Sequence, residues 1–448
     1  MLRRTLAIAL GAAMGAVLPA AAAEDLVQIY HEAVANDPTL ASARATWMAT
    51  QENVPQARAN LLPSVTLAAN ATETNFYERL HTDPSVSITQ NFPQYQYTVT
   101  ASQPLYRKQN SVALDQAKET IGQSDYVLSS AQQDLIIRVA QAYFDVLLAR
   151  FTIDLTVSQK AAVSENLAQA KRNFEVGTAT ITDTNDAQAK YDQIVAQEIA
   201  AQNDYDNKVA ALRAIIGRQP KELRRFEAQY DPQLPTPNAL DTWIGAALHD
   251  NSQVRIAQSN YDIAVLEVER QRAAHYPTLD LVASFNQGYA GAAVQVTISS
   301  FVANDQRQGQ IGVQLNVPLY LGGSIESKVR QAVALQEKSR QDLEAARRAA
   351  ELLAQTAFTG VTSGVAQINA FKQALVSAQV SYDSTKLGLE VGVRTNLDVL
   401  NQQQQVYQTR FNLAQSYYNF ILSSLKLKQA VGTLSEADVD EVNRAFGG

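Results

Sequence analysis

Four short segments of the chain alternate between apolar and polar residues with a period of two. Two lie in the first half, at residues 65–72 and 95–102, and two lie in the second half, at residues 279–286 and 310–317. Side chains alternate across a strand, so each segment is predicted to be a β-strand with one apolar and one polar face. The apolar face fits either the core of a soluble sandwich or the lipid side of a membrane barrel.

Two long stretches predict helices that exceed the size of a globular core. Residues 107–176 contain no proline and one glycine, Gly122, and residues 324–390 also lack proline. About 70 helical residues would extend roughly 100 Å. Apolar or small residues recur at sevens in both stretches: Leu114, Ile121, Leu128 and Leu135, then Val329, Leu343, Ala350 and Ala357. This repeat predicts coiled-coil packing, and a plain structural coiled coil is one alternative.

The two halves of the chain repeat one another with an offset of about 214 residues. Leu26–Leu67 matches Leu240–Leu281, and Glu175-Val176-Gly177 recurs at residues 390–392. Each half predicts a helix, two strands, a long helix, a glycine turn and a second long helix. The expected parts are a signal peptide (1–23), a first repeat (24–218), a proline-rich linker (219–238), a second repeat (239–433) and a C-terminal segment (434–448).

The N-terminus has the order of an export signal. Arg3 and Arg4 precede an apolar run at residues 6–18, and small residues at 20–23 offer a cleavage site before Glu24. A buried N-terminal helix is the alternative, and the sequence does not fix the cleavage site. Export favours a membrane barrel over a soluble sandwich for the four strands. Their length agrees, since each segment has about the 9–11 residues that a tilted spanning strand needs.

Aromatic residues and strand number both bear on the barrel. Aromatics cluster where interfacial girdles would lie: Phe76, Tyr77, Phe92, Tyr95, Phe285 and Tyr289. Four strands cannot close a barrel, and open edges in lipid would cost several kcal/mol for each unpaired backbone group. Several copies must therefore share one barrel. Two copies would give eight strands and three would give twelve, and the strand pattern does not choose between them.

Composition narrows the function classes. The chain has no cysteine, 18% charged residues and a net charge of −7. Disulfides, cysteine-ligated zinc, a thiol nucleophile and a lipid-acceptor cysteine are excluded, and nucleic-acid binding is disfavoured. The histidines lie far apart without metal-ligand spacing: His31, His81, His249 and His275. Catalytic motifs such as GxSxG or HExxH are absent from the sequence. We expect no enzyme, no metal and no cofactor.

Several motifs together resemble the TolC family of outer-membrane efflux and secretion channels. They are FEVGTATITDTNDAQAKYD, LEVGVRTNLDVLN, the joints QPLY and VPLY, and AVGTLSEADVDEVNRA near the end. The resemblance covers nearly all of residues 24–446. It implies a mixed α and β membrane protein: a homotrimer with a 12-stranded β-barrel, four strands per chain, continuous with a periplasmic α-helical barrel of coiled coils. The linker and the C-terminal segment would form an equatorial region.

The resemblance also implies a location and partners. The channel would sit in the outer membrane of a Gram-negative bacterium and extend into the periplasm. It would work with a periplasmic adaptor and an inner-membrane ABC or proton-driven pump, as the exit duct of an efflux or type I secretion system. A periplasmic coiled-coil adaptor or structural protein without channel activity is the alternative. The sequence does not name the cargo.

A gate at the periplasmic end is implied residue by residue. Thr182 and Asp183 match family positions that link to an arginine, which is Arg394 here. The position of the family's gate tyrosine holds Leu389, so one hydrogen bond of that latch is missing. A plainer interpretation is that Asp183 caps a helix after a turn.

The resemblance further implies a luminal acidic ring and docking turns. Asp398 matches the first of two ring carboxylates, and the second position holds Asn401. Its counterpart in the first repeat is Asp186, so we hypothesise that the second ring has moved to the other helix pair. Three carboxylates near one axis would favour cations. The adaptor would dock at the two helix turns, which carry Val176, Gly177, Val391 and Gly392.

Overall fold

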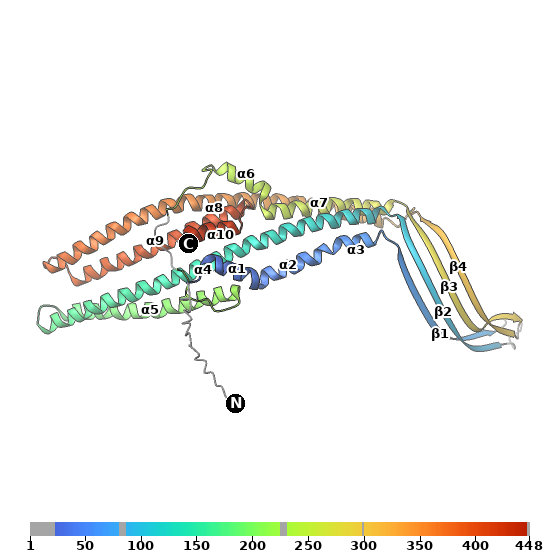
Figure 1. Cartoon of the computed structure of the whole chain (residues 1–448), viewed down its shortest axis with the longest axis horizontal. Coiled ribbons are helices and arrows are strands. Elements are labelled where there is room, and N and C mark those ends of the chain that lie inside the picture. The colour runs from blue at the N-terminus through green and yellow to red at the C-terminus, as the bar shows by residue number, and fades with distance from the viewer. Residues whose placement is uncertain (1–22, 80–86, 225–230, 298–299, 446–448) are drawn as a thin grey trace, which may run out of the picture.

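The computed structural model describes residues 23–79, 87–224, 231–297 and 300–445 and has a strongly elongated shape (Figure 1). A curved sheet forms one end, and paired long helices form the rest. The expected signal peptide lies almost entirely outside the described residues, so its prediction is not addressed by the structure.

A single antiparallel sheet contains all four predicted strands. They are β1 (Ser64–Arg79), β2 (Ser87–Tyr106), β3 (Thr278–Thr297) and β4 (Ser300–Asn316), in the order β1-β2-β3-β4. The two repeats join where β2 pairs with β3, with Thr98 opposite Asn286. The strands have 16 to 20 residues and extend beyond the alternating segments. In the single chain, β1 and β4 are left as open edges.

The long helices agree with the sequence prediction. α4 (Lys108–Glu175) has 68 residues and α8 (Ser324–Glu390) has 67, and each folds back onto a shorter partner, α5 (Ile181–Ile216) or α9 (Asn396–Ala430). In the seven-residue registers, Leu135, Leu343, Ala350 and Ala357 are buried and the other four members are partly buried. The coiled-coil interpretation of these helices is therefore confirmed.

Shorter helices complete the fold: most extend the pairs towards the sheet, and α10 packs against α1. They are α1 (Leu26–Asn36), α2 (Pro38–Gln51), α3 (Asn53–Ala59), α6 (Leu240–Asp250), α7 (Ser252–Arg272), the 3-10 helix η1 (Ala273–His275) and α10 (Glu436–Ala445). Helices α2 and α3 pack along α4, and α7 packs between α4 and α8. Within the described residues, no helix combines the length and apolar character needed to cross a bilayer.

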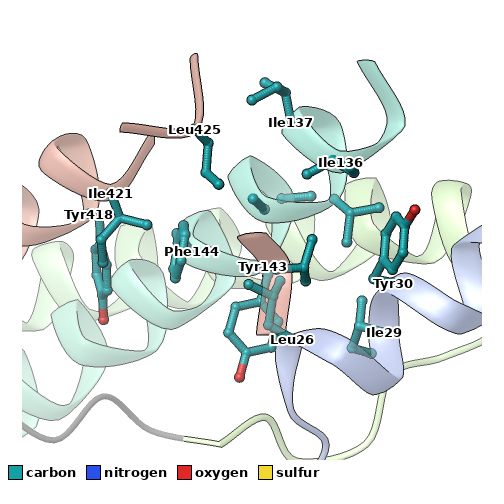
Figure 2. Close-up of a cluster of buried hydrophobic side chains, with 14 of the residues drawn as sticks. Leu26, Ile29, Tyr30, Ile136, Ile137, Tyr143, Phe144, Tyr418, Ile421 and Leu425 are labelled. Carbon is teal, nitrogen blue, oxygen red and sulfur yellow. The ribbon is translucent and has the colours of Figure 1, made fainter. Parts of the chain in front are cut away.

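The main hydrophobic core lies near the middle of the long axis, where α1, α4, α5, α9 and α10 meet (Figures 1 and 2). Phe144 of α4 stacks on Tyr418 of α9 with ring centroids 5.3 Å apart. Lys428 of α9 bonds Asp438 of α10 at 2.6 Å and fixes the C-terminal segment there. Aromatic side chains bury 150–250 Å² each, so this cluster carries much of the packing energy.

A charged pair fastens the sheet to the helices. Arg107, the N-cap residue of α4, donates from Nε and Nη2 to the two carboxylate oxygens of Asp280 on β3, both at 2.8 Å. Asp280 is only 7% exposed. Such a two-pronged contact fixes orientation as well as distance, so it ties the first repeat to the second where strands become helices.

Candidate functional site

The far ends of the long helices form two turns with the same geometry. Gly177 follows α4 and Gly392 follows α8, each with φ of 77°, which closes the helix in the left-handed region that glycine tolerates. After the first glycine, the Thr178 N–H donates to Asn173 O at 2.8 Å, and after the second the Val393 N–H donates to Gly388 O at 2.9 Å. The predicted repeat therefore extends to hydrogen bonds at these tips.

Both tips expose apolar side chains to solvent. Val176 is 73% exposed and Val391 is 66% exposed. Further large apolar side chains that are at least 40% exposed surround them: Phe174, Ile181, Leu387, Val393 and Leu397. Exposed apolar groups gathered at one place are typical of a surface that meets a partner.

Each turn leads into a helix closed by the same capping box. Asp183 accepts hydrogen bonds from the Thr180 backbone N–H at 2.9 Å and hydroxyl at 2.8 Å, and the Thr180 hydroxyl accepts from the Asp183 N–H. Thr395 and Asp398 repeat this arrangement on the second tip. These bonds from Thr180 hold the pKa of Asp183 below its usual value of 3.8. Asp183 thus fulfils the plainer interpretation, helix capping, in the single chain.

One cavity of about 620 Å³ lies between the two tips and collects part of the predicted gate. Asp183, Leu389 and Arg394 line it together. Thr182, which was predicted to share the latch, is exposed and does not contribute to the lining. The structure therefore brings an acid from one tip and an arginine from the other to the same space.

Within the described residues, Arg394 makes no ion pair with Asp183. Its side chain packs over Gly388, where an added Cβ would lie 2.7 Å from Arg394 Cγ. Its charge acts on its own tip: bonds from the Thr395 N–H and hydroxyl, and then the Arg394 charge, lower the pKa of Asp398. The latch between the tips thus stays a prediction.

The predicted acidic ring residues lie outside this cavity. Asp186 and Asn401 are exposed, while Asp398 is half-buried by its cap. Asp186 follows Asp183 by three residues on α5 and therefore lies on the same side of that helix. The single chain leaves Asp186 and Asn401 open to solvent.

The cavity lining also includes residues that were not predicted, among them Tyr382, Lys386 and Gln403. Tyr382 precedes Leu389 by seven residues, so the heptad register already placed it on the same side of α8. The Gln403 Oε1 atom is buried, and so is the Thr184 Oγ1 atom beside Asp183; neither has a partner among the described residues. Val163, Ile194 and Leu400 form a small core that joins α4, α5 and α9 nearby.

Comparisons with known proteins agree with this architecture. The family model described as outer membrane efflux protein matches residues 29–218 and 243–433. The chain is 34% identical to the outer membrane protein TolC of Vibrio cholerae over 99% of its length and 98% of that protein. It is 29% identical to the proteases secretion protein PrtF of Dickeya chrysanthemi, over 95% and 92%. The CmeC outer membrane channel of Campylobacter jejuni shares the fold, with a TM-score of 0.78, 15% identity and coverage of 94% and 89%.

Proposed function

This chain belongs to the outer membrane efflux protein family and is an outer-membrane exit channel for efflux and type I secretion; we propose that its path is passive and is gated at the helical tips. The protein resides in the outer membrane of a Gram-negative bacterium and extends into the periplasm. Its relatives are channel proteins rather than enzymes.

Three copies share one barrel in this proposal. The open sheet edges, β1 and β4, have backbone groups that need partners in lipid and so support sharing between copies. The number three is what the resemblance to the TolC family implies. Apolar side chains at both edges of this face are available to lipid: Val65 is 69% exposed and Ile311 is 75% exposed. These two residues lie in the same row across the sheet. From Val65 the apolar residues of β1 continue away from the helices, whereas from Ile311 those of β4 continue towards the helices. An apolar band that slants across the rows fits strands tilted in a barrel.

The gate consists of the tips that surround the 620 Å³ cavity. Asp183 and Arg394 supply opposite charges on the two tips, and the attraction between them favours the closed arrangement. Because both side chains are wet, each contact is worth only about 0.2–1 kcal/mol, which a docking partner can outweigh. Asp398, with Asp186 as the second acid, forms the cation-attracting rings above it.

A periplasmic adaptor docks on the exposed apolar tips around Val176 and Val391, and an inner-membrane pump supplies the energy. The matched pair of turns supports this proposal, because each chain presents an exposed valine on the same backbone conformation twice. Substituting Val176→Glu and Val391→Glu would remove the apolar contact while leaving the turn glycines in place.

The observation that carries the channel proposal is one sheet with an apolar face and two unpaired edges joined to hydrated helices. The test uses the purified full chain. We expect a detergent-dependent trimer that resists carbonate extraction from membranes and gives single-channel currents in planar bilayers. A protein that washes off with carbonate and stays monomeric in buffer would contradict the proposal. Dye and protein export in a deletion strain would then identify the cargo class.

A further inference from the structure

The polar face of the sheet is uncharged along most of its length. The strand registers define the rows of side chains that lie on this face, from the helix end outward. They are Ser64/Ser102/Val282/Gly312, Thr66/Thr100/Ser284/Gln310, Ala68/Thr98/Asn286/Gln308, Asn70/Gln96/Gly288/Gln306 and Thr72/Gln94/Ala290/Asn304. Every polar member of these rows is a hydroxyl or a carboxamide, and none can ionise.

These neutral groups bond to one another across the strands. Gln96 Nε2 donates to Asn286 Oδ1 at 3.1 Å, and the Thr98 hydroxyl donates to the same oxygen at 3.3 Å. Along β4, carboxamides occupy every second position from Asn304 to Asn316 except Gly312. The face is therefore a network of dipoles that can exchange hydrogen bonds with water or with peptide groups at little net cost.

Most charges of the same strands lie elsewhere, and Glu78, which is in the register of the polar face, pairs with Ile88 beyond these rows at the outer end of β1. Glu73, Asp305 and Arg307 belong to the opposite face, in register with the apolar stripe. Asp280 does lie on the polar face, at the helix end of β3, but Arg107 satisfies both of its oxygens and it is 7% exposed. A neutralised, buried carboxylate adds little field to the passage.

We propose that the barrel is an uncharged, hydrogen-bonding passage that passes extended polypeptide segments of either charge sign, so that charge selection is confined to the helical tips. This inference rests on the proposed function, which makes the polar face the lumen. A ring of identical charges would focus a field and would trap or repel a charged segment. Neutral rows do neither, so these rows add no second electrostatic filter to the tips.

The natural absence of cysteine makes the test direct, because a single introduced thiol is unique in the chain. Gln308→Cys and Thr100→Cys place it on the polar face, Asn401→Cys places it beside the tip acids, and Ile311→Cys is the lipid-face control. Each trimer is reconstituted in zwitterionic vesicles. The rate of cysteine modification is then measured with a cationic reagent, trimethylammonium-ethyl methanethiosulfonate, and with an anionic one, sulfonato-ethyl methanethiosulfonate. Each rate is divided by the rate at which the same reagent modifies free mercaptoethanol.

At Gln308→Cys and Thr100→Cys we expect a normalised cation-to-anion rate ratio within about threefold of unity, and at Asn401→Cys a ratio of about tenfold or more, since charged clefts concentrate counter-ions to that extent. A ratio of tenfold or more at the barrel positions, or near unity at Asn401→Cys, would overturn the inference.

The lipid-face control separates this inference from the function on which it rests. If Ile311→Cys reacts and Gln308→Cys does not, the two faces have been assigned the wrong way round and the barrel proposal itself fails. If Gln308→Cys and Thr100→Cys react, Ile311→Cys is protected, and the barrel still shows a strong charge preference, only the uncharged passage is refuted.

Discussion

Substitutions at Asp183 can separate the two roles that this carboxylate would have at the tip. One oxygen of Asp183 accepts from both the Thr180 N–H and the Thr180 hydroxyl, and the amide oxygen of asparagine can accept the same two bonds, so Asp183→Asn removes the charge and retains the cap. Asp183→Ala removes both. The wet pair with Arg394 is worth about 0.5 kcal/mol per subunit, and three subunits together about 1.5 kcal/mol. We therefore expect Asp183→Asn to raise the ratio of open to closed states roughly tenfold, since about 1.4 kcal/mol is a factor of ten.

The assay is the distribution of conductance levels of single trimers in planar bilayers at low salt, where screening is weak. Arg394→Ser should raise the open fraction by a similar factor, and the double variant should add little to either. Asp192→Asn, an exposed acid on the same helix, is the control for lost charge.

The result that refutes the latch is an unchanged open fraction in both Asp183→Asn and Arg394→Ser. If Asp183→Ala alone changes the current, Asp183 acts only as a helix cap. If Asp192→Asn matches Asp183→Asn, the effect comes from net charge and not from the pair.

Three further predictions address the rings, the fold and pH. Asp186→Asn should weaken block of the open channel by divalent cations added from the periplasmic side, and unchanged block would reject the displaced second ring. Gly432→Ala should lower the thermal unfolding midpoint far more than Gly392→Ala. Both glycines have positive φ, so either substitution should cost about 1 kcal/mol of stability from backbone strain. Only at Gly432 would the new Cβ also collide with the Asp250 carbonyl oxygen. The pKa values of Asp183 and Asp398 lie below 3.8 in the folded chain, so their capping contribution is present above the unfolded pKa and is lost only as the pH falls through the lower folded pKa. The closed-channel current should therefore stay constant from pH 7 to pH 5, and a midpoint between these values would show that other groups control closure.

The fold was predictable because its two periodicities are long and clean. The period of two at residues 279–286 and the sevens from Leu114 to Leu135 each leave one structural solution for the segment. Strand ends were not predictable, since β2 and β3 stay paired with their neighbours well past the stretches that alternate between apolar and polar residues. The charged pair of Arg107 and Asp280 was equally hidden, because its partners lie 173 residues apart.

The gate was predictable only in part. Asp183 was predicted as a helix cap, and the structure shows that its partner in the capping box is Thr180, within one helical turn. The cavity partners Tyr382 and Gln403 belong to other helices, and only the heptad register could have indicated Tyr382. The approach of Arg394 to Asp183 was not visible in any local pattern, because the two residues lie 211 positions apart on different tips.

The matched repeats of strands, turns and capping boxes point to an ancestor half as long, six copies of which would have enclosed the same ring. After duplication and fusion, the two halves could accumulate different residues. Arg107 and Asp280 correspond to Leu321 and Thr66 in the other half, and Arg394 corresponds to Ala179. An acid on one tip and an arginine on the other, as with Asp183 and Arg394, became possible only after this divergence. In a ring of identical units every tip would have carried the same residue.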